Sequence, residues 1–169
     1  MLEEESKMSK KEEKMLDTIN YAKPQLYLLL ALRVIIGYHF LNEGLSKLFT
    51  TTWSSGGFLI QSNWIFSDIF IAIANSPTIV MISDFLNIWG QIFIGLGLML
   101  GLFSRYAAFA GAILLLLYYV AIPPFIEGYT FVDRNLLELF GLLVTALFQT
   151  SQIIGLDGLL SKIRNERND

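Results

Sequence analysis

The chain contains no cysteine among its 169 residues, and it has a single histidine, His39. The absence of cysteine excludes disulfides, thiolate metal sites, cysteine nucleophiles and Cys-x-x-Cys redox chemistry. One histidine cannot build a His-rich zinc site, and it excludes a haem held by two histidines of one chain. The sequence therefore predicts no metal or haem site within this chain.

Charged residues are also scarce. They make up 16% of the chain, against about 25% in a typical soluble domain, whereas hydrophobic residues make up 54%. The net charge of −3 and the pI of about 5.1 provide no basic field for nucleic acid. This composition argues against a soluble domain and against a disordered chain. It indicates a small all-α integral membrane protein.

Four apolar segments have about the length of roughly 20 residues that a helix needs to cross a bilayer. They cover approximately residues 25–49, 79–103, 106–125 and 135–154. Backbone groups in lipid must pair within their own segment, so helices are the expected form. We therefore predict a four-transmembrane-helix bundle.

The connection between the first two segments is itself apolar. Residues 57–74 are interrupted by polar residues, among them Gln61, Asn63 and Asp68, and the stretch is short for a span. We predict a short interfacial or re-entrant helix in this first outer connection. A fifth span is the alternative, but it would place the two charged tails on opposite sides of the membrane.

The distribution of lysine and arginine predicts the orientation. The N-terminal segment, residues 1–24, contains five lysines mixed with six acids, and the tail from 157 to 169 also carries basic residues. The positive-inside rule then places both termini in the cytoplasm. We predict a multi-pass protein of the cell (cytoplasmic) membrane with three parts: a polar N-terminal segment (1–24), a four-helix membrane domain (25–156) and a cytoplasmic tail (157–169).

Ionisable side chains within spans are costly and are candidates for function. The first segment carries four: Arg33, His39, Glu43 and Lys47. The last three recur at i,i+4 spacing and share one stripe of a helix. Glu43 and Lys47 are also consistent with a surface ion pair near the helix end, and His39 with a packing residue. Arg33 has three readings: a buried structural residue, a snorkelling residue or a ligand contact.

The fourth segment adds Arg134 and Glu138, which also lie four residues apart. Asp133 is the expected helix N-cap, and Glu138 is also consistent with a charge that only complements the helix dipole. If they turn inward, Arg134 and Glu138 meet the stripe of the first helix at the outer end of the bundle. Tyr119 of the third segment lies toward the same side. The sequence thus predicts a polar pocket suited to an amphiphile.

Gly97 and Gly101 form a GxxxG pair in the second segment. Small residues at this spacing are typical of close helix packing in membranes. The pattern predicts a close helix contact, either within the chain or between two copies in a homo-oligomer.

Three stretches together resemble the DoxX/DoxD-like family of small four-helix membrane proteins. They are LRVIIGYHFLNEGLSKL (32–48), WGQIFIGLGLMLGLFSRYAA (89–108) and VDRNLLELFGLLV (132–144), followed by IIGLDGLL (153–160). The resemblance covers nearly all of residues 25–160. The sequence departs from the family at Gln91, where many members carry an acid, so no acid–base role is transferred to that position.

The family is named for subunits of a thiosulfate:quinone oxidoreductase, so the resemblance implies electron transfer to the quinone pool. In that function His39 and Glu43 would deliver protons as the catalytic residues, and Arg33, Lys47, Tyr119, Arg134 and Glu138 would bind the ligand. Without cysteine the chain passes no electrons through a thiol, so a redox partner subunit would supply them. Membrane lipid is the other expected partner, and nucleic acid is not.

Two further functions fit the same residues. A non-enzymatic binder of lipid or small molecules, or an assembly factor for membrane proteins, explains a polar pocket without redox chemistry. Ion or metabolite transport also fits buried charge and close helix packing. Whether the chain is itself an enzyme stays open at this stage.

Overall fold

The computed structural model describes residues 23–127 and 131–166, and all of the regular secondary structure in these ranges is helical. Four longer helices are α2 (Lys23–Phe49), α5 (Pro77–Leu100), α6 (Ser104–Ala121) and α7 (Arg134–Leu147). Shorter helices are α3 (Gly56–Leu59), α4 (Ser67–Ala74), η1 (Pro124–Glu127), η2 (Thr150–Gln152) and α8 (Leu156–Glu166). The predicted N-terminal segment lies outside the described residues except for its last two positions.

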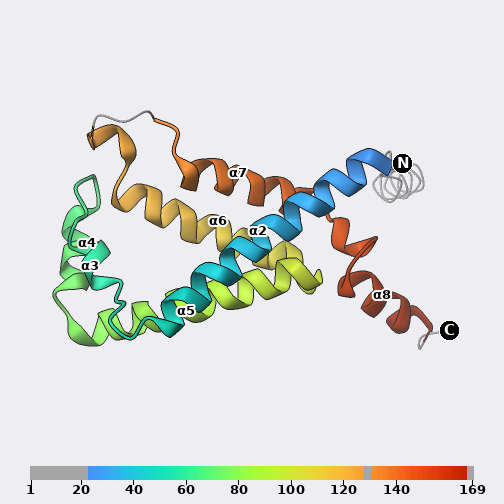
Figure 1. Cartoon of the computed structure of the whole chain (residues 1–169), viewed down its shortest axis with the longest axis horizontal. Coiled ribbons are helices and arrows are strands. Elements are labelled where there is room, and N and C mark those ends of the chain that lie inside the picture. The colour runs from blue at the N-terminus through green and yellow to red at the C-terminus, as the bar shows by residue number, and fades with distance from the viewer. Residues whose placement is uncertain (1–22, 128–130, 167–169) are drawn as a thin grey trace, which may run out of the picture.

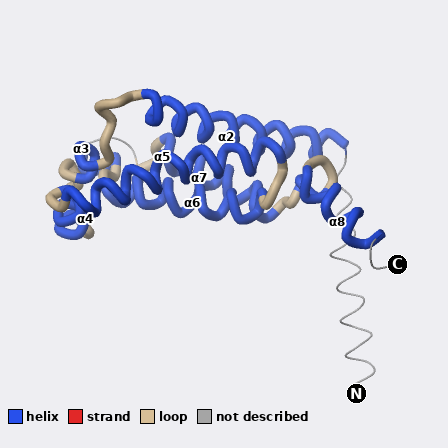
Figure 2. The backbone as a smooth tube through the Cα atoms, turned by 90° about the horizontal axis from the view of Figure 1, so that it is seen from below, coloured by secondary structure: helices blue, strands red, loops and turns tan. Residues whose placement is uncertain are grey.

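The longer helices run side by side, with the short elements at the two ends (Figures 1 and 2). α3 and α4 lie at one end of the bundle, whereas the beginning of α2 and the whole of α8 lie at the other. We call these the α4 end and the α8 end. The arrangement is an all-helical bundle, as the sequence predicts.

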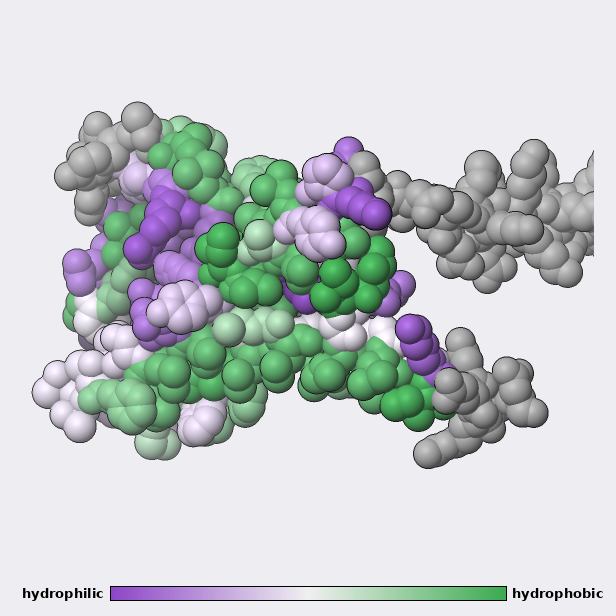
Figure 3. Space-filling model, turned by 45° about the vertical axis from the view of Figure 1, so that its right-hand side comes forward, coloured by the Kyte–Doolittle hydropathy of each residue, from purple (hydrophilic) through white to green (hydrophobic). Residues whose placement is uncertain are grey.

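Three of these helices, α2, α5 and α6, are long and apolar enough to cross a membrane. At most 39% of the residues in their most apolar windows are buried inside the molecule. The face drawn in Figure 3 is accordingly hydrophobic over much of the bundle, with the hydrophilic residues gathered toward its two ends. Exposing large apolar side chains such as Leu28, Met81 and Ile113 to water to this extent would be unfavourable, and lipid is the environment that suits them. The chain is a multi-pass membrane protein.

The closest helix contact joins α2 to α5. A Cβ added at Gly95 would lie 2.5 Å from the backbone nitrogen of Leu41 and 2.7 Å from the carbonyl oxygen of Gly37. Gly44 meets α5 in the same way, since its Cβ would lie 2.9 Å from the backbone nitrogen of Ile92. Because only glycine leaves room for such an approach, these three glycines set the distance between the two helices.

The two glycines of the predicted packing pair, Gly97 and Gly101, have different roles. Gly101 is the C-cap of α5, with φ of 66°, a left-handed conformation that glycine adopts without strain. A Cβ there would lie 2.9 Å from Cα of Gly155 and 3.2 Å from the Arg33 guanidinium. Gly97 approaches Ala107 of α6 and the carbonyl of Leu102. Gly101 therefore builds the turn between α5 and α6, whereas Gly97 makes a close contact with α6 within the chain, as the GxxxG pattern predicted.

Arg33 anchors the α8 end. Its side chain is 2% exposed and donates hydrogen bonds to Oγ1 of Thr150 at 3.2 Å and to the carbonyl oxygen of Ile154 at 2.8 Å. Of the readings left open by the sequence, the buried structural one describes this geometry.

Asp157 secures the same end from the other side of the turn. Its carboxylate accepts from the backbone N–H groups of Phe103 and Ser104 at 2.8 and 3.3 Å, and its own N–H donates to the carbonyl of Gly101 at 2.9 Å. The first N–H groups of α6 have no partner within the helix, so this carboxylate replaces the missing acceptors.

The fourth helix is shorter than the predicted segment 135–154. Asp133 accepts a hydrogen bond from the N–H of Leu136 at 2.8 Å, which confirms the predicted N-cap. α7 then ends at Leu147 after 14 residues, and the chain turns through η2. In this turn Thr150, 2% exposed, accepts a hydrogen bond from the Arg33 guanidinium. Residues 57–74 were predicted as one short helix. The structure has two helices there, α3, which begins one residue earlier, and α4, with a turn between them.

Candidate functional site

Four of the five ionisable residues that the sequence grouped together lie between α2 and α7. His39 and Glu43 come from α2, and Arg134 and Glu138 from the first turns of α7. Nδ1 of His39 lies 3.6 Å from Oε1 of Glu138, and Nε2 lies 3.9 Å from Oε1 of Glu43. His39 therefore stands between two carboxylates. All four residues line one small cavity, which we call the polar cavity.

The two i,i+4 pairs explain this convergence. Residues four apart stand above one another on a helix, so each helix presents two side chains to the other. Glu138 is the more enclosed acid, with 13% of its side chain exposed against 42% for Glu43. The polar cavity has a volume of about 60 Å³, which is room for water molecules but below the roughly 300 Å³ at which small-molecule pockets begin.

Lys47 does not join these residues, although the sequence grouped it with them. Its Nζ donates to Oε1 of Gln91 at 2.8 Å, to Oδ1 of Asn87 at 3.0 Å and to the hydroxyl of Tyr118 at 3.3 Å. The ammonium also lies over the ring of Trp53, 5.1 Å from its centroid. All three acceptors are neutral, so Lys47 brings an unneutralised positive charge into the bundle.

The Glu43–Lys47 ion pair that the spacing permitted is not formed. Among the residues that the structure describes, the contacts within 4.0 Å between a basic side chain and a carboxylate are those of His39 with Glu43 and Glu138. The physical reason lies in α5: Asn87 and Gln91 are both buried, and their amide oxygens need donors, which the Lys47 ammonium provides. Glu43 acts on Lys47 only as a more distant charge.

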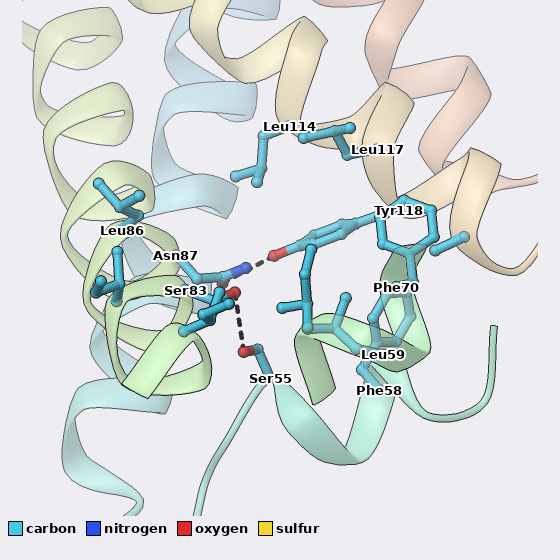
Figure 4. Close-up of a pocket in the computed structure, with 14 residues that line it drawn as sticks. Ser55, Phe58, Leu59, Phe70, Ser83, Leu86, Asn87, Leu114, Leu117 and Tyr118 are labelled. Carbon is cyan, nitrogen blue, oxygen red and sulfur yellow. Dashed lines mark hydrogen bonds between the residues drawn. The ribbon is translucent and has the colours of Figure 1, made fainter. Parts of the chain in front are cut away.

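A larger pocket lies on the other side of Tyr118. It has a volume of about 300 Å³ and is enclosed by α3, α4, α5 and α6. Figure 4 shows Phe58, Leu59 and Phe70 on one side and Leu86, Leu114 and Leu117 on the other. We call it the apolar pocket. No charged side chain is among the fourteen described residues that line it.

The few polar groups of the apolar pocket gather on one wall. Oγ of Ser55 donates to Oγ of Ser83 at 3.0 Å, and the hydroxyl of Tyr118 donates to Oδ1 of Asn87 at 2.8 Å (Figure 4). The ring of Phe58 packs edge-on against Tyr118, with 5.4 Å between the centroids. An amphiphile in this pocket would have its polar end at the Asn87–Tyr118 wall.

Tyr118 lines both cavities. The amide nitrogen of Gln91, a residue of the polar cavity, donates to its hydroxyl at 3.4 Å. Lys47, Asn87, Gln91 and Tyr118 thus form a partition, the Lys47 cluster, between a polar cavity large enough for water and a pocket large enough for a ligand. A hydrogen-bonded chain joins the two spaces through this cluster.

Two predicted ligand-binding residues lie elsewhere. Arg33 stands at the α8 end, bonded to Thr150 and Ile154. The hydroxyl of Tyr119 donates to the carbonyl of Phe131 at 2.8 Å, so this tyrosine ties α6 to the chain just before α7. Neither residue lines the polar cavity or the apolar pocket.

The sequence reasoning did not single out Asn87, Ser55 or Ser83. A signal existed for Asn87, because it lies four residues before Gln91 in an otherwise apolar helix, and amides at that depth need partners. No sequence signal pointed to the two serines, since their meeting depends on how the α2–α3 connection folds back onto α5. Within the described ranges, no group of three or more His, Cys, Asp or Glu side chains is arranged to hold a metal ion.

Comparison with known proteins gives one result. The family model described as DoxX matches residues 28–123, more than half of the chain, from the first turns of α2 to the end of α6. No curated protein and no solved structure matches the chain.

Proposed function

Because this chain belongs to the DoxX family, we propose that it binds a membrane quinone and serves as the membrane subunit of a quinone-linked oxidoreductase system. The observation that carries the proposal is the position of Tyr118, whose hydroxyl stands between the apolar pocket and the polar cavity. A quinone needs both surroundings: an apolar space for its ring and tail, and hydrogen-bond donors and protons at its ring oxygens.

We place the quinone ring in the apolar pocket, against the Asn87–Tyr118 wall. The pocket is of the size of known small-molecule sites, whereas the polar cavity is not. On binding, the Tyr118 hydroxyl would turn its proton from Oδ1 of Asn87 to a ring oxygen, and the amide nitrogen of Asn87 would donate as well. The Lys47 ammonium behind them would stabilise negative charge that develops there. The prenyl tail would lie along Leu114 and Leu117 toward the lipid.

The polar cavity would supply protons. Each electron that reaches a quinone on its way to quinol is balanced by a proton, and the electrons would come from a redox partner subunit. His39, Glu43 and Glu138 are the groups of the cavity that exchange protons, with Arg134 as the positive charge beside them. Tyr118, which lines both spaces, would pass its hydroxyl proton to the ring oxygen and regain one from the polar cavity, while the Gln91 amide orients its hydroxyl.

The same proposal includes the topology. α7 with η2 would form the fourth span beside α2, α5 and α6, with α3 and α4 at the outer membrane surface. The α8 end, where α2 begins, would then face the cytoplasm, together with both termini, in agreement with its basic residues. Reporter fusions at the two tails test this arrangement, and activity of a periplasmic reporter at either tail would overturn it.

A non-redox binder of lipid or another small amphiphile is the second candidate. The observation that favours it is the lining of the apolar pocket, in which no described residue is charged. Such a lining holds any apolar chain that ends in a hydrogen-bonding group.

Binding of a decyl-tailed benzoquinone to the purified full-length chain in nanodiscs tests the proposal. We expect Tyr118→Phe to weaken binding about five- to tenfold, because one hydrogen bond of about 1 kcal/mol is lost. Tyr119→Phe is the matched control, since its hydroxyl is bonded to Phe131 outside the pocket. Absence of quinone binding, with fatty acid or phospholipid co-purifying instead, would favour the second candidate.

The proton supply has its own test. A redox titration of the bound quinone at several pH values should show proton uptake with the electrons. In stopped-flow reduction, His39→Ala or Glu43→Gln should slow that uptake while the melting temperature changes little. Unchanged proton uptake in both variants would remove the polar cavity from the mechanism but leave quinone binding intact.

A further inference from the structure

A third cavity lies at the α8 end, separate from the site described above. It has a volume of about 440 Å³ and is lined by the α5–α6 turn, the start of α6, η2 and α8. Its polar residues are Arg105, Gln149, Gln152, Asp157, Ser161 and Arg164, and its apolar ones are Phe103, Tyr106 and Leu160. We call it the basic cavity.

Two arginines from different elements meet in the basic cavity. Arg105 belongs to the first turn of α6 and Arg164 to the last turn of α8, and both are exposed. Neither makes an ion pair with any residue whose side chain the structure describes. Two guanidinium groups that face one space without a counter-ion create a site of positive potential.

The acid of the cavity does not neutralise them. The Asp157 carboxylate accepts from the N–H groups of Phe103 and Ser104 and from the Ser104 hydroxyl. It also interacts electrostatically with the buried guanidinium of Arg33. Because the Asp157 carboxylate interacts with Arg33 and with the N-terminus of α6, Arg105 and Arg164 remain available for an external anion.

The surroundings of the cavity are those of a membrane surface. Leu156, Leu159, Leu160 and Ile163 of α8 recur at i, i+3, i+4 and i+7, and between 38% and 55% of each is exposed. A helix with such a stripe lies in the plane of the interface with its apolar face in the lipid. Phe103 and Tyr106, which are 64% and 73% exposed, stand beside it as interfacial aromatic anchors do.

We propose that the basic cavity is a binding site for an anionic phospholipid, whose phosphate lies between Arg105 and Arg164. The arginines match a phosphate because guanidinium groups donate to its oxygens in pairs. The amides of Gln149 and Gln152 would donate to the glycerol or head group, and the Ser161 hydroxyl, which donates to the carbonyl of Gly158 at 2.9 Å, would accept from it. The acyl chains would descend past Phe103 and Tyr106 along α6. The lipid would thereby join α8 to the bundle.

Native mass spectrometry of the full chain in detergent, with equimolar phosphatidylglycerol and phosphatidylcholine, tests the site. The wild type should retain phosphatidylglycerol preferentially, and Arg105→Gln combined with Arg164→Gln should lower that retention roughly tenfold or more. Lys162→Gln is the matched control, since Lys162 is a basic residue of α8 that does not line the cavity. It should keep the preference.

Several outcomes would overturn the proposal. Equal retention of the two lipids by the wild type would exclude head-group recognition. An equal loss in Lys162→Gln and in Arg164→Gln would indicate general surface charge rather than a site. Displacement of the lipid by millimolar inorganic phosphate would show a site for free phosphate. Ser161→Trp, which fills the cavity without changing charge, should lower retention as well, and its failure to do so would also count against the site.

Discussion

Lys47 and Gln91 are joined by a hydrogen bond of 2.8 Å between the ammonium Nζ and the side-chain oxygen Oε1, so a charge of α2 is held by an amide of α5. The contact places the lysine among neutral acceptors rather than beside Glu43. It also fixes the partition between the polar cavity and the apolar pocket. The charge that the sequence pointed to is therefore located between the two spaces and in neither of them.

Lys47→Met should destabilise the protein. The substitution removes the donor for Asn87 and Gln91, both buried, and leaves their oxygens with fewer partners. Hydrogen bonds to a charged group contribute about 1.5–3 kcal/mol, so we expect a loss of about 2 kcal/mol and a clearly lower melting temperature in detergent. Lys162→Met, at an exposed position of α8, is the control. Equal melting of both variants would contradict this role.

Gly95→Ala should destabilise the α2–α5 contact. The new Cβ would lie 2.5 Å from the backbone nitrogen of Leu41, and backbone atoms cannot move aside as a flexible side chain can. Overpacking of this kind costs about 1–3 kcal/mol. Gly90→Ala on the same helix meets nothing within 4 Å and should melt at the wild-type temperature or above. Thermal unfolding of the two variants in one detergent makes the comparison.

The sequence predicted much of this architecture because the determining signals are local. The apolar segments, the Asp133 cap and the i,i+4 stripes of α2 and α7 depend on neighbours within one or two turns. The meeting of His39 with Glu138 followed because two such stripes lie at the same end of adjacent helices.

What the sequence missed depends on contacts between distant segments. The direction in which the Lys47 side chain points is decided by its hydrogen bonds to Asn87 and Gln91, which lie forty residues away or more in the sequence. The role of Gly101 is decided by Arg33 and Gly155, which a GxxxG pattern cannot reveal. Just after the early end of α7, Thr150 accepts a hydrogen bond from Arg33, a contact between residues 117 positions apart in the chain.

Arg33→Leu should loosen the α8 end. The carbonyl of Ile154 would lose its donor in a part-buried site, and Gly101 would lose the guanidinium against which it packs. We expect faster cleavage by a protease in the region of η2 and α8, with a stability loss of about 2 kcal/mol. Thr150→Val removes one acceptor of the same guanidinium and should have a smaller effect. A Leu variant as resistant to cleavage as the wild type would show that the anchor is dispensable.

Filling the apolar pocket should abolish ligand binding without disturbing the polar groups. Ile73 of α4 lines the pocket, and a tryptophan at this position would occupy part of its 300 Å³. Ile69, one turn earlier on α4, is 58% exposed and does not line it, so Ile69→Trp adds the same bulk outside. We therefore expect Ile73→Trp to lower the affinity for the benzoquinone probe more than tenfold, and Ile69→Trp to leave it within about twofold, since a ligand cannot share a filled space. The comparison locates the ligand whatever its chemistry. Equal binding by both variants would place the quinone outside the apolar pocket, and it would also contradict the role assigned to Tyr118.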